Sequence, residues 1–305
     1  MQSTGSWYDV RTDSGETVSC RLRGQFRIKG IKTTNPIVVG DHVEFIIEAD
    51  GCGYITRIEP RKNYIDRKST NLSKISHIIA ANIDQAFLVV TMKEPRTSLG
   101  FIDRFLLAAE GFRIPTHLVF NKMDIYSEAE KENIEAVRQI YEKIGYPTLL
   151  TSTKTGAGIE ELKSLMSGKV SLFSGHSGVG KSAIINTIDA SLNLRVGAIS
   201  DVHNKGKHTT TFAAMFQVAD GFIIDTPGIK EFGLIQYKPD EIRDYFREIR
   251  SFNNQCRFNN CTHTHEPGCK VQEAVANGEI APSRYENYIA ILNGDDMKIE
   301  EWKLK

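Results

Sequence analysis

Residues 175–182 read Gly-His-Ser-Gly-Val-Gly-Lys-Ser. They fit the pattern G-x-x-x-x-G-K-[ST] and lie between an apolar stretch at 170–173 and a run of helical character that begins at 183. A glycine-rich turn between a strand and a helix lets backbone N–H groups and the positive end of the helix surround a phosphate chain. The sequence therefore predicts a nucleotide-binding loop in an α/β domain.

Two side chains of this loop have predicted chemical roles. Lys181 is expected to contact the β- and γ-phosphates and to take part in catalysis, and the Ser182 hydroxyl is expected to bind Mg²⁺. The whole loop contributes to the predicted nucleotide site, which here comprises Ser174, Gly175, His176, Ser177, Gly178, Val179, Gly180, Lys181 and Ser182. The loop alone does not say which nucleotide binds.

A second motif, Asn121-Lys122-Met123-Asp124, follows the apolar stretch 116–120 and matches the guanine signature N-K-x-D. The Asp124 carboxylate can accept hydrogen bonds from N1–H and the 2-amino group of guanine, a donor pair that adenine lacks. Asn121 is expected to tie this loop to the phosphate loop, and the stem of Lys122 to cover one face of the base. Residues 121–124 are therefore the predicted base-binding segment.

A third motif, Thr-Ser-Thr-Lys at 151–154, is similar to the S-A-K loop, whose backbone N–H contacts guanine O6. Ser152 therefore joins the predicted site. Each of these motifs follows an apolar stretch typical of a buried parallel strand. Together they predict a pocket for a guanine nucleotide.

Two further segments match the switch regions of GTPases. Asp225-Thr-Pro-Gly228 fits D-x-x-G, in which the carboxylate of Asp225 holds Mg²⁺ through water and the N–H of Gly228 senses the γ-phosphate. The segment Lys-His-Thr-Thr-Thr at 207–211 supplies the threonine of switch I. Any of its three threonines is a candidate Mg²⁺ ligand, and we favour Thr210. These motifs predict a GTPase.

The order of the motifs is a circular permutation. In an ordinary GTPase the phosphate loop comes first, followed by the switches, N-K-x-D and S-A-K. In this chain N-K-x-D is the first of these motifs and D-x-x-G is the last. A parallel sheet tolerates this rearrangement because the neighbouring strands stay the same. Switch II, at 225–233, then leads directly into the C-terminal region, and we expect loss of the γ-phosphate to be reported as movement of that region.

The catalytic group is less clear from the motifs. Ile229 follows D-x-x-G, where many GTPases carry a glutamine that orients the attacking water, and isoleucine cannot form that hydrogen bond. His208 in switch I is our candidate for holding the water. The alternative is that His208 only stabilises its loop.

Three cysteines and a histidine lie close together near the C-terminus, in the spacing Cys256-x4-Cys261-x-His263-x5-Cys269. Three thiolates and an imidazole are a common structural zinc set, and four protein ligands leave no open position for catalysis. His265 is a rival for the fourth place, and a redox cysteine cluster is the alternative interpretation. The other two cysteines, at 20 and 52, are expected to be buried small residues.

The remaining sequence predicts three domains, at 1–72, 73–233 and 234–305. Short β segments at 7–11, 17–23, 43–47 and 53–58 favour an OB-fold barrel, and the polar stretch 59–74 reads as a linker. Apolar runs at 83–91, 115–120, 148–150, 170–173 and 222–224 alternate with helical patterns, as in a doubly wound α/β domain. The last domain is predicted to be helical around the cysteine cluster, with helices near 239–250, 270–277 and 283–293.

Charge and composition exclude few functions. The formal net charge is zero, but residues 1–74 carry 12 basic against 9 acidic side chains. From charge alone, a surplus of three is typical of a solvated face, and it also fits an RNA-binding barrel. The N-terminus lacks the layout of a secretory signal, and no apolar run approaches the ~18 residues of a membrane span. Five cysteines are an odd number, and three of them lie between 256 and 269, which argues against a secreted disulfide framework, so we expect a cytoplasmic protein. We also expect a monomer with no membrane partner.

The permuted order, the phosphate loop, Gly-Lys-His-Thr-Thr-Thr at 206–211 and the cysteine cluster together resemble the ribosome small-subunit-dependent GTPase A (RsgA, YjeQ/YloQ) family. The resemblance spans the whole chain. Lys207 stands where that family usually has arginine, and the family's switch I histidine falls on His208.

The resemblance implies a GTPase that binds the small ribosomal subunit late in its assembly and contacts ribosomal RNA near the decoding centre. The subunit is expected to stimulate hydrolysis, and hydrolysis to release the protein, with the barrel and the zinc domain supplying the contacts. One alternative is a GTP-regulated RNA- or ribosome-binding module in which hydrolysis is incidental. Another P-loop enzyme, such as a kinase, is disfavoured by Asp124.

Overall fold

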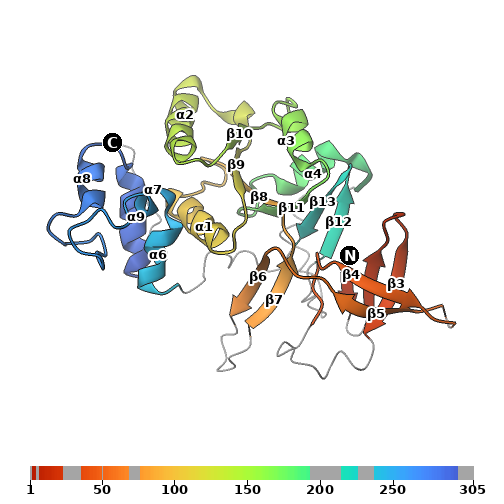
Figure 1. The fold of residues 1–305 in the computed structure, drawn as a ribbon. Helices are drawn as coiled ribbons and strands as arrows, with labels where there is room; N and C mark the ends of the chain where they lie inside the picture. Colours follow the sequence, from red (N-terminus) through yellow and green to blue (C-terminus); the bar gives the residue numbers. More distant parts are fainter. Residues whose placement is uncertain are drawn as a thin grey trace.

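The computed structural model describes residues 2–4, 7–22, 36–49, 51–68, 76–192, 214–225 and 237–294. Three groups of elements follow one another along the chain: N-terminal strands, a central α/β part and C-terminal helices. In Figure 1 the N-terminal strands and the C-terminal helices lie on opposite sides of the central part. This arrangement confirms the predicted multidomain fold class.

The N-terminal strands are β1 (Gln2–Thr4), β2 (Trp7–Arg11), β3 (Thr17–Leu22), β4 (Val43–Ile47) and β5 (Gly53–Ile58). β2 pairs antiparallel with β3, β4 pairs antiparallel with β5, and β3 pairs parallel with β5. Tyr8, Cys20 and Ile55 form the buried centre of this group. Cys20 is buried as expected, whereas Cys52 is only partly buried.

The prediction of a linker at 59–74 is wrong for part of its length. Residues Tyr64–Lys68 form β6, which pairs antiparallel with β7 (Ser76–Ala81) in a separate two-stranded sheet. The polar sequence did not indicate a strand, because the backbone hydrogen bonds between paired strands do not require apolar side chains. Ile65 alone supplies an apolar anchor, and it is buried in the core of the central part.

The central part is built on a parallel sheet. Its strands are β8 (Gln85–Val90), β9 (Thr116–Phe120), β10 (Thr148–Leu150), β11 (Val170–Ser174) and β13 (Gly221–Asp225), in the order β10-β9-β8-β11-β13. All five coincide with predicted apolar runs, because strands covered on both faces read as continuous apolar segments. β12 (Ala214–Val218) adds antiparallel to β13, and β1 pairs with β12.

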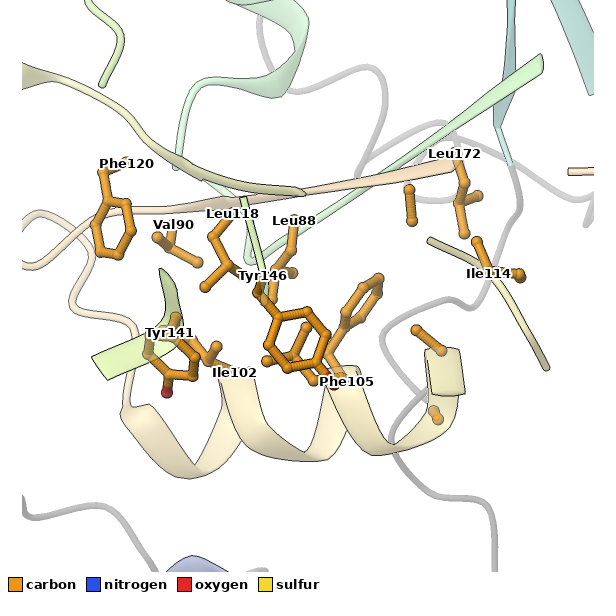
Figure 2. Packing of buried hydrophobic residues seen from close by; sticks show 14 of the residues in the cluster. Leu88, Val90, Ile102, Phe105, Ile114, Leu118, Phe120, Tyr141, Tyr146 and Leu172 are labelled. Carbon is orange, nitrogen blue, oxygen red and sulfur yellow. The ribbon is translucent and has the colours of Figure 1, made fainter. Parts of the chain in front are cut away.

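Helices cover both faces of this sheet. α1 (Leu99–Gly111) and α2 (Glu128–Lys143) pack on one face, while α3 (Ile159–Met166) and α4 (Lys181–Ile188) pack on the other. Successive residues of β8 alternate between the two cores, as strand geometry requires. Figure 2 shows Ile102 and Phe105 of α1 directed at Leu88 and Leu118 of the sheet. Short 3-10 turns occur at Met123–Ile125 (η2) and Ala190–Leu192 (η3).

The C-terminal helices are α6 (Pro239–Tyr245), α7 (Arg247–Arg250), α8 (Lys270–Ala276) and α9 (Pro282–Leu292). The continuous helix predicted near 239–250 is broken at Phe246, whose backbone is extended and whose side chain is fully buried. These helices share a core with Leu107 of α1, so they pack directly on the central part. Within the described residues, no helix is long and apolar enough to cross a membrane.

Candidate nucleotide site and metal centre

The phosphate loop has the predicted strand–loop–helix setting. β11 ends at Ser174 and α4 begins at Lys181. Gly175 has φ +138°, and a Cβ there would lie 2.2 Å from the carbonyl oxygen of Val89. Gly180 caps α4 with φ +100°. Both glycines are therefore required by the backbone and the space around them.

Lys181 is drawn into the loop that precedes it. Its side chain is buried, and its Nζ donates to the carbonyl oxygens of Gly175 (2.7 Å) and His176 (2.8 Å). Ser182 is also buried beside it. The ammonium group is thus held at the mouth of the loop by two neutral acceptors, which an anionic phosphate oxygen can replace.

Asn121 links the two predicted halves of the site. Its Nδ2 donates to the carbonyl oxygen of Val179 in the phosphate loop (2.8 Å), and its Oδ1 accepts from the hydroxyl of Thr151 (3.0 Å). Asn121 is fully buried, so both bonds are shielded from water. The N-K-x-D segment, the S-A-K-like loop and the phosphate loop therefore meet at the carboxyl edge of the sheet.

Asp124 lies on the open side of this junction. The hydroxyl of buried Ser152 donates to Asp124 Oδ1 at 2.6 Å. This hydrogen bond, more than the nearby Lys154 and Lys122, lowers the pKa of the Asp124 carboxyl from its ordinary value. The carboxylate is exposed, ionised and fixed in direction, which is the state needed to accept two N–H groups of a base.

The segment that runs from the end of β8 into the first turn of α1 also borders the site, and no sequence motif indicated it. The ring of Phe101 lies 3.9 Å from the ring of His176, centroid to centroid. A Cβ at Gly178 would lie 3.4 Å from Pro95, and Lys122 Nζ donates to the carbonyl oxygen of Glu94. The available signal was topological: this segment follows a parallel strand at the edge where the other loops gather.

Several predicted residues lie outside the described part of the chain. His208, Thr210 and Gly228 fall in 193–213 and 226–236, which the structure does not describe. Asp225 is the last residue of β13, paired with Ala214, but its side chain is not described. The roles predicted for these four residues remain predictions.

The four predicted metal ligands come together in the C-terminal part. The ligand atoms of Cys256, Cys261, His263 and Cys269 lie within 4.8 Å of one another. His263 Nδ1 is 3.6 Å from Cys256 Sγ and 3.4 Å from Cys269 Sγ. A tetrahedral Zn²⁺ with ordinary bond lengths separates sulfur from nitrogen by about 3.5 Å. The cluster could therefore hold one zinc ion.

The choice between the two histidines is resolved by position. His263 is buried and belongs to the cluster, whereas exposed His265 makes its side-chain contact with the Thr264 hydroxyl at 2.8 Å. The backbone around His263, at φ +62°, is held by the Tyr285 hydroxyl, which donates to the His263 carbonyl oxygen at 2.6 Å. Tyr288 likewise donates to the carbonyl oxygen of Thr262.

The Glu266 carboxylate also holds the loop that carries the metal ligands. Glu266 accepts hydrogen bonds from the N–H and hydroxyl of Thr262, both at 2.6 Å, and from the N–H of Thr264 at 3.0 Å. Burial favours the neutral acid, but these donors outweigh it and lower the pKa of Glu266. The loop that carries the metal ligands is thus held by hydrogen bonds in which the cysteine Sγ atoms and the histidine ring nitrogen take no part.

Comparisons with known proteins agree with this geometry. Residues 1–55 match the model of the RsgA N-terminal domain, and residues 58–235 match the model of the RsgA GTPase. The chain is 52% identical over 293 residues to the small ribosomal subunit biogenesis GTPase RsgA 2 of Bacteroides thetaiotaomicron, covering 96% of this chain and 94% of that protein. It is 50% identical over 299 residues to the small ribosomal subunit biogenesis GTPase RsgA of Flavobacterium johnsoniae, covering 97% and 92%.

Solved structures give the same result. YjeQ from Thermotoga maritima superimposes with a TM-score of 0.78 at 39% identity, over 95% of this chain and 94% of that one. YloQ, described as a circularly permuted GTPase, superimposes with a TM-score of 0.75 at 27% identity, over 98% and 94%. The permuted motif order, the linked nucleotide loops and these matches lead to one conclusion: the chain belongs to the RsgA family of circularly permuted GTPases.

Proposed function

We propose that this protein hydrolyses GTP to GDP and phosphate during late maturation of the small ribosomal subunit. The observation that carries the proposal is the Asn121 bridge, which joins the base-reading loop to the phosphate loop at one edge of the sheet. The relatives' names supply the biological setting, because they are called small ribosomal subunit biogenesis GTPases. Stimulation by the subunit and release after hydrolysis complete the proposed cycle.

Recognition of guanine depends on Asp124. Its ionised carboxylate, oriented by Ser152, accepts N1–H and the 2-amino group of the base. Asn121 keeps this carboxylate at a fixed distance from the phosphate loop. Residues 174–182 wrap the phosphates, and the backbone of Ser152 and its neighbours approaches the base from the other side.

Phosphate chemistry depends on Lys181 and the switches. Lys181 exchanges its two carbonyl partners for the β- and γ-phosphate oxygens and stabilises the charge that develops there. Mg²⁺, held by Ser182 and Thr210 with Asp225 acting through water, would neutralise the phosphate oxygens. His208 holds the attacking water, and Gly228 senses the γ-phosphate.

The Cys₃His cluster would hold one structural zinc. Cys256, Cys261, His263 and Cys269 would supply four protein ligands, so the ion would organise the 256–269 loop and leave no open position for a reaction. Thiolate–imidazole sites of this kind contribute folding free energy directly. A redox role is disfavoured because the imidazole lies among the thiols at ligand distance.

The remaining proposals concern partners and organisation. The protein is proposed to act as a cytoplasmic monomer, with residues 1–72 as the RNA-binding barrel, 73–233 as the GTPase domain and 234–305 as the zinc domain. Its partners are the small subunit and the ribosomal RNA of that subunit. The basic surplus of the N-terminal part supports a role in RNA contact.

Co-sedimentation with purified subunits tests this function. Small and large subunits are each mixed with the protein in GDP and in a non-hydrolysable GTP analogue. We expect the protein to pellet with small subunits in the analogue and to be released in GDP. Equal binding in both nucleotides, together with unstimulated turnover, would favour the alternative of a binding module with incidental hydrolysis.

A further inference from the structure

The turn that follows β8 supports the lysine of the base-binding segment. Lys122 Nζ donates to the carbonyl oxygen of Glu94, which lies in this turn. The stem of Lys122 is the group expected to cover one face of the base. An ammonium group that is fixed at Glu94 therefore also fixes the direction of the stem. We refer to residues 91–97 as the β8 turn.

The backbone at both ends of this hydrogen bond is constrained. Lys122 has φ +62° and Glu94 has φ +54°, and both values lie in the left-handed region. A residue with a Cβ adopts that region at a cost, and it stays there only where the surrounding structure holds it. Backbone held in this way is typical of ligand clamps. Other groups of the chain must therefore fix the Lys122–Glu94 contact.

Tyr126 supplies two of the bonds that hold the β8 turn. Its hydroxyl oxygen accepts from the backbone N–H of Met92 at 2.8 Å and from that of Lys93 at 3.4 Å. The ring of Tyr126 is buried in the core that β8 and α1 share. Tyr126 directly follows η2, the short turn that carries the end of the base-binding segment. Its hydroxyl thus ties the β8 turn to the base-binding segment.

Two buried threonines hold the β8 turn internally. The backbone N–H of Thr91 donates to Thr97 Oγ1 at 3.2 Å, and the N–H of Thr97 donates to the carbonyl oxygen of Thr91 at 2.8 Å. Thr91 Oγ1 donates to the carbonyl oxygen of Pro95, the residue that follows Glu94. These bonds close the turn across its width, so a support at Met92 and Lys93 is transmitted to Glu94.

We propose that Tyr126 is a positioning residue of the nucleotide site. Its hydroxyl holds the backbone of Met92 and Lys93, and this places the carbonyl oxygen of the next residue, Glu94. That oxygen receives Lys122 Nζ, so the lysine stem is directed over the face of the guanine base. The inference rests on the proposed function for its ligand, the guanine nucleotide, and it assigns no chemical step to Tyr126.

The test begins with Tyr126→Phe in the full-length protein, which removes the hydroxyl and keeps the ring in the core. Affinity for GDP, measured by titration calorimetry, should fall about 3- to 10-fold, as expected for loss of one hydrogen-bonded support. Tyr146→Phe is the matched control and should bind GDP as the unmodified protein does. Tyr146 is buried in the same core (Figure 2), and its hydroxyl donates to Glu110 at 3.3 Å, at the end of α1 away from the phosphate loop.

A double-mutant cycle with Lys122→Met separates positioning from general support of the fold. Methionine keeps an apolar stem but cannot donate to the carbonyl oxygen of Glu94. If Tyr126 acts through Lys122, Tyr126→Phe should cause no further loss of GDP affinity in the Lys122→Met background. Losses that multiply would overturn the proposal, because Tyr126 would then act independently of the lysine.

A comparison of two bases separates Lys122 from Asp124, which lies two residues before Tyr126. Inosine diphosphate lacks the 2-amino group that Asp124 is proposed to accept, but it offers a similar base face to Lys122. Tyr126→Phe should therefore weaken binding of GDP and of inosine diphosphate by the same factor. A loss confined to GDP would overturn the proposal, because the hydroxyl would then act through Asp124.

Thr97→Val decides the question if Tyr126→Phe does not fold. It removes the acceptor of the Thr91 N–H and loosens the same turn, so it should lower GDP affinity in the unmodified background and not in Lys122→Met. Unchanged GDP affinity in the folded variant would overturn the proposal.

The proposed function is judged separately, by subunit-stimulated GTP turnover of the unmodified protein. Stimulation with no effect of Tyr126 on GDP affinity refutes only the positioning role. An effect of Tyr126 on GDP affinity without stimulation refutes only the proposed function.

Discussion

Arg284 and Asp103 form a buried ion pair that joins the C-terminal helices to the central domain. Arg284 Nη1 lies 2.6 Å from Asp103 Oδ1, and the two side chains are 3% and 0% exposed. Arg284 also pairs with Glu248 of α7 at 2.6 Å, and the Tyr141 hydroxyl of α2 donates to Asp103 at 2.7 Å. Asn287 donates to the other oxygen of Asp103. The polar groups of this interface are thus mutually satisfied.

Helix α1, which carries Asp103, also reaches the nucleotide site. Asp103 lies on α1 two residues after Phe101, whose ring packs on His176 of the phosphate loop. The C-terminal region was expected to follow the nucleotide through switch II, but residues 226–236 lie outside the described part of the chain. Within the described residues, α1 contacts both regions: Phe101 packs on His176 of the phosphate loop, and Asp103 pairs with Arg284 of the C-terminal helices.

Replacing Arg284 should test how strongly the two parts are joined. Arg284→Met leaves Asp103 and Glu248 buried without a counter-ion, and breaking a buried pair costs about 3–5 kcal/mol. We expect a clearly lower urea midpoint of unfolding, or a separate early transition of the C-terminal part. Arg57→Met is the matched control, because its ion pair with Glu44 is exposed and worth no more than about 1 kcal/mol. Equal midpoints for both variants would contradict the interface described here.

Gly180 tests the Asn121 bridge. In Gly180→Ala a Cβ would lie 2.3 Å from Asn121 Nδ2, so the bridge must shift, and φ +100° adds about 1–3 kcal/mol of backbone strain. Nucleotide affinity, measured with a fluorescent GDP analogue, should fall at least tenfold. Gly278→Ala carries similar strain at φ +74° with no atom within 4 Å, far from the site. It should leave affinity unchanged, and a similar loss in both variants would argue against the bridge.

Asp124 tests the base reading. Asp124→Asn removes the charged acceptor for two guanine N–H groups, so GTP affinity should fall about 10- to 100-fold. Xanthine carries a carbonyl in place of the 2-amino group, and the asparagine amide can donate to it. Affinity for xanthosine triphosphate should therefore rise in the same variant, which also demonstrates that it is folded. An unchanged preference for GTP would refute the assignment of Asp124.

Glu266 tests the support of the metal loop. Glu266→Gln replaces an anionic acceptor of several hydrogen bonds, and loss of an outer contact of this kind typically costs 10–100-fold in metal affinity. Zinc release to a colorimetric chelator should be correspondingly faster. Glu273→Gln is the control, because its carboxylate is exposed and pairs with Lys270 on the same helix. Equal rates of zinc release in both variants would show that Glu266 does not stabilise the metal site.

Acidification should act on the same loop. The pKa of Glu266 is lower in the folded chain than its ordinary value of 4.5, so its stabilising contribution is complete above that pH. The contribution is lost as pH falls below 4.5 toward the folded pKa. The unmodified protein should therefore lose more stability in this acid range than Glu266→Gln does, as measured by urea unfolding at a series of pH values.

The sequence predicted most of the central fold because its parallel strands are apolar on both faces and short. It missed β12, in which Phe216 and Gln217 are exposed, because an antiparallel strand with one open face lacks that continuous pattern. It also missed β6, whose pairing with β7 depends on backbone bonds. Local composition does not encode pairing that depends on backbone hydrogen bonds, even between segments as close in sequence as β6 and β7 or β12 and β13.

The candidate site likewise contains residues that sequence motifs predicted and contacts that they did not. The motifs placed Asn121, Asp124 and Lys181 correctly at one sheet edge, because each motif carries its own chemistry at a strand end. The contact of Phe101 with His176 has no motif, since one aromatic ring on a helix reads as core. The Arg284–Asp103 pair joins residues 181 positions apart, and only the fold brings them together.

GTP turnover in the presence and absence of purified small ribosomal subunits tests the central claim most directly. The protein alone should hydrolyse GTP slowly, and small subunits should raise the rate by an order of magnitude or more while large subunits do not. A rate that is the same with and without small subunits, or that large subunits raise equally, would contradict the account.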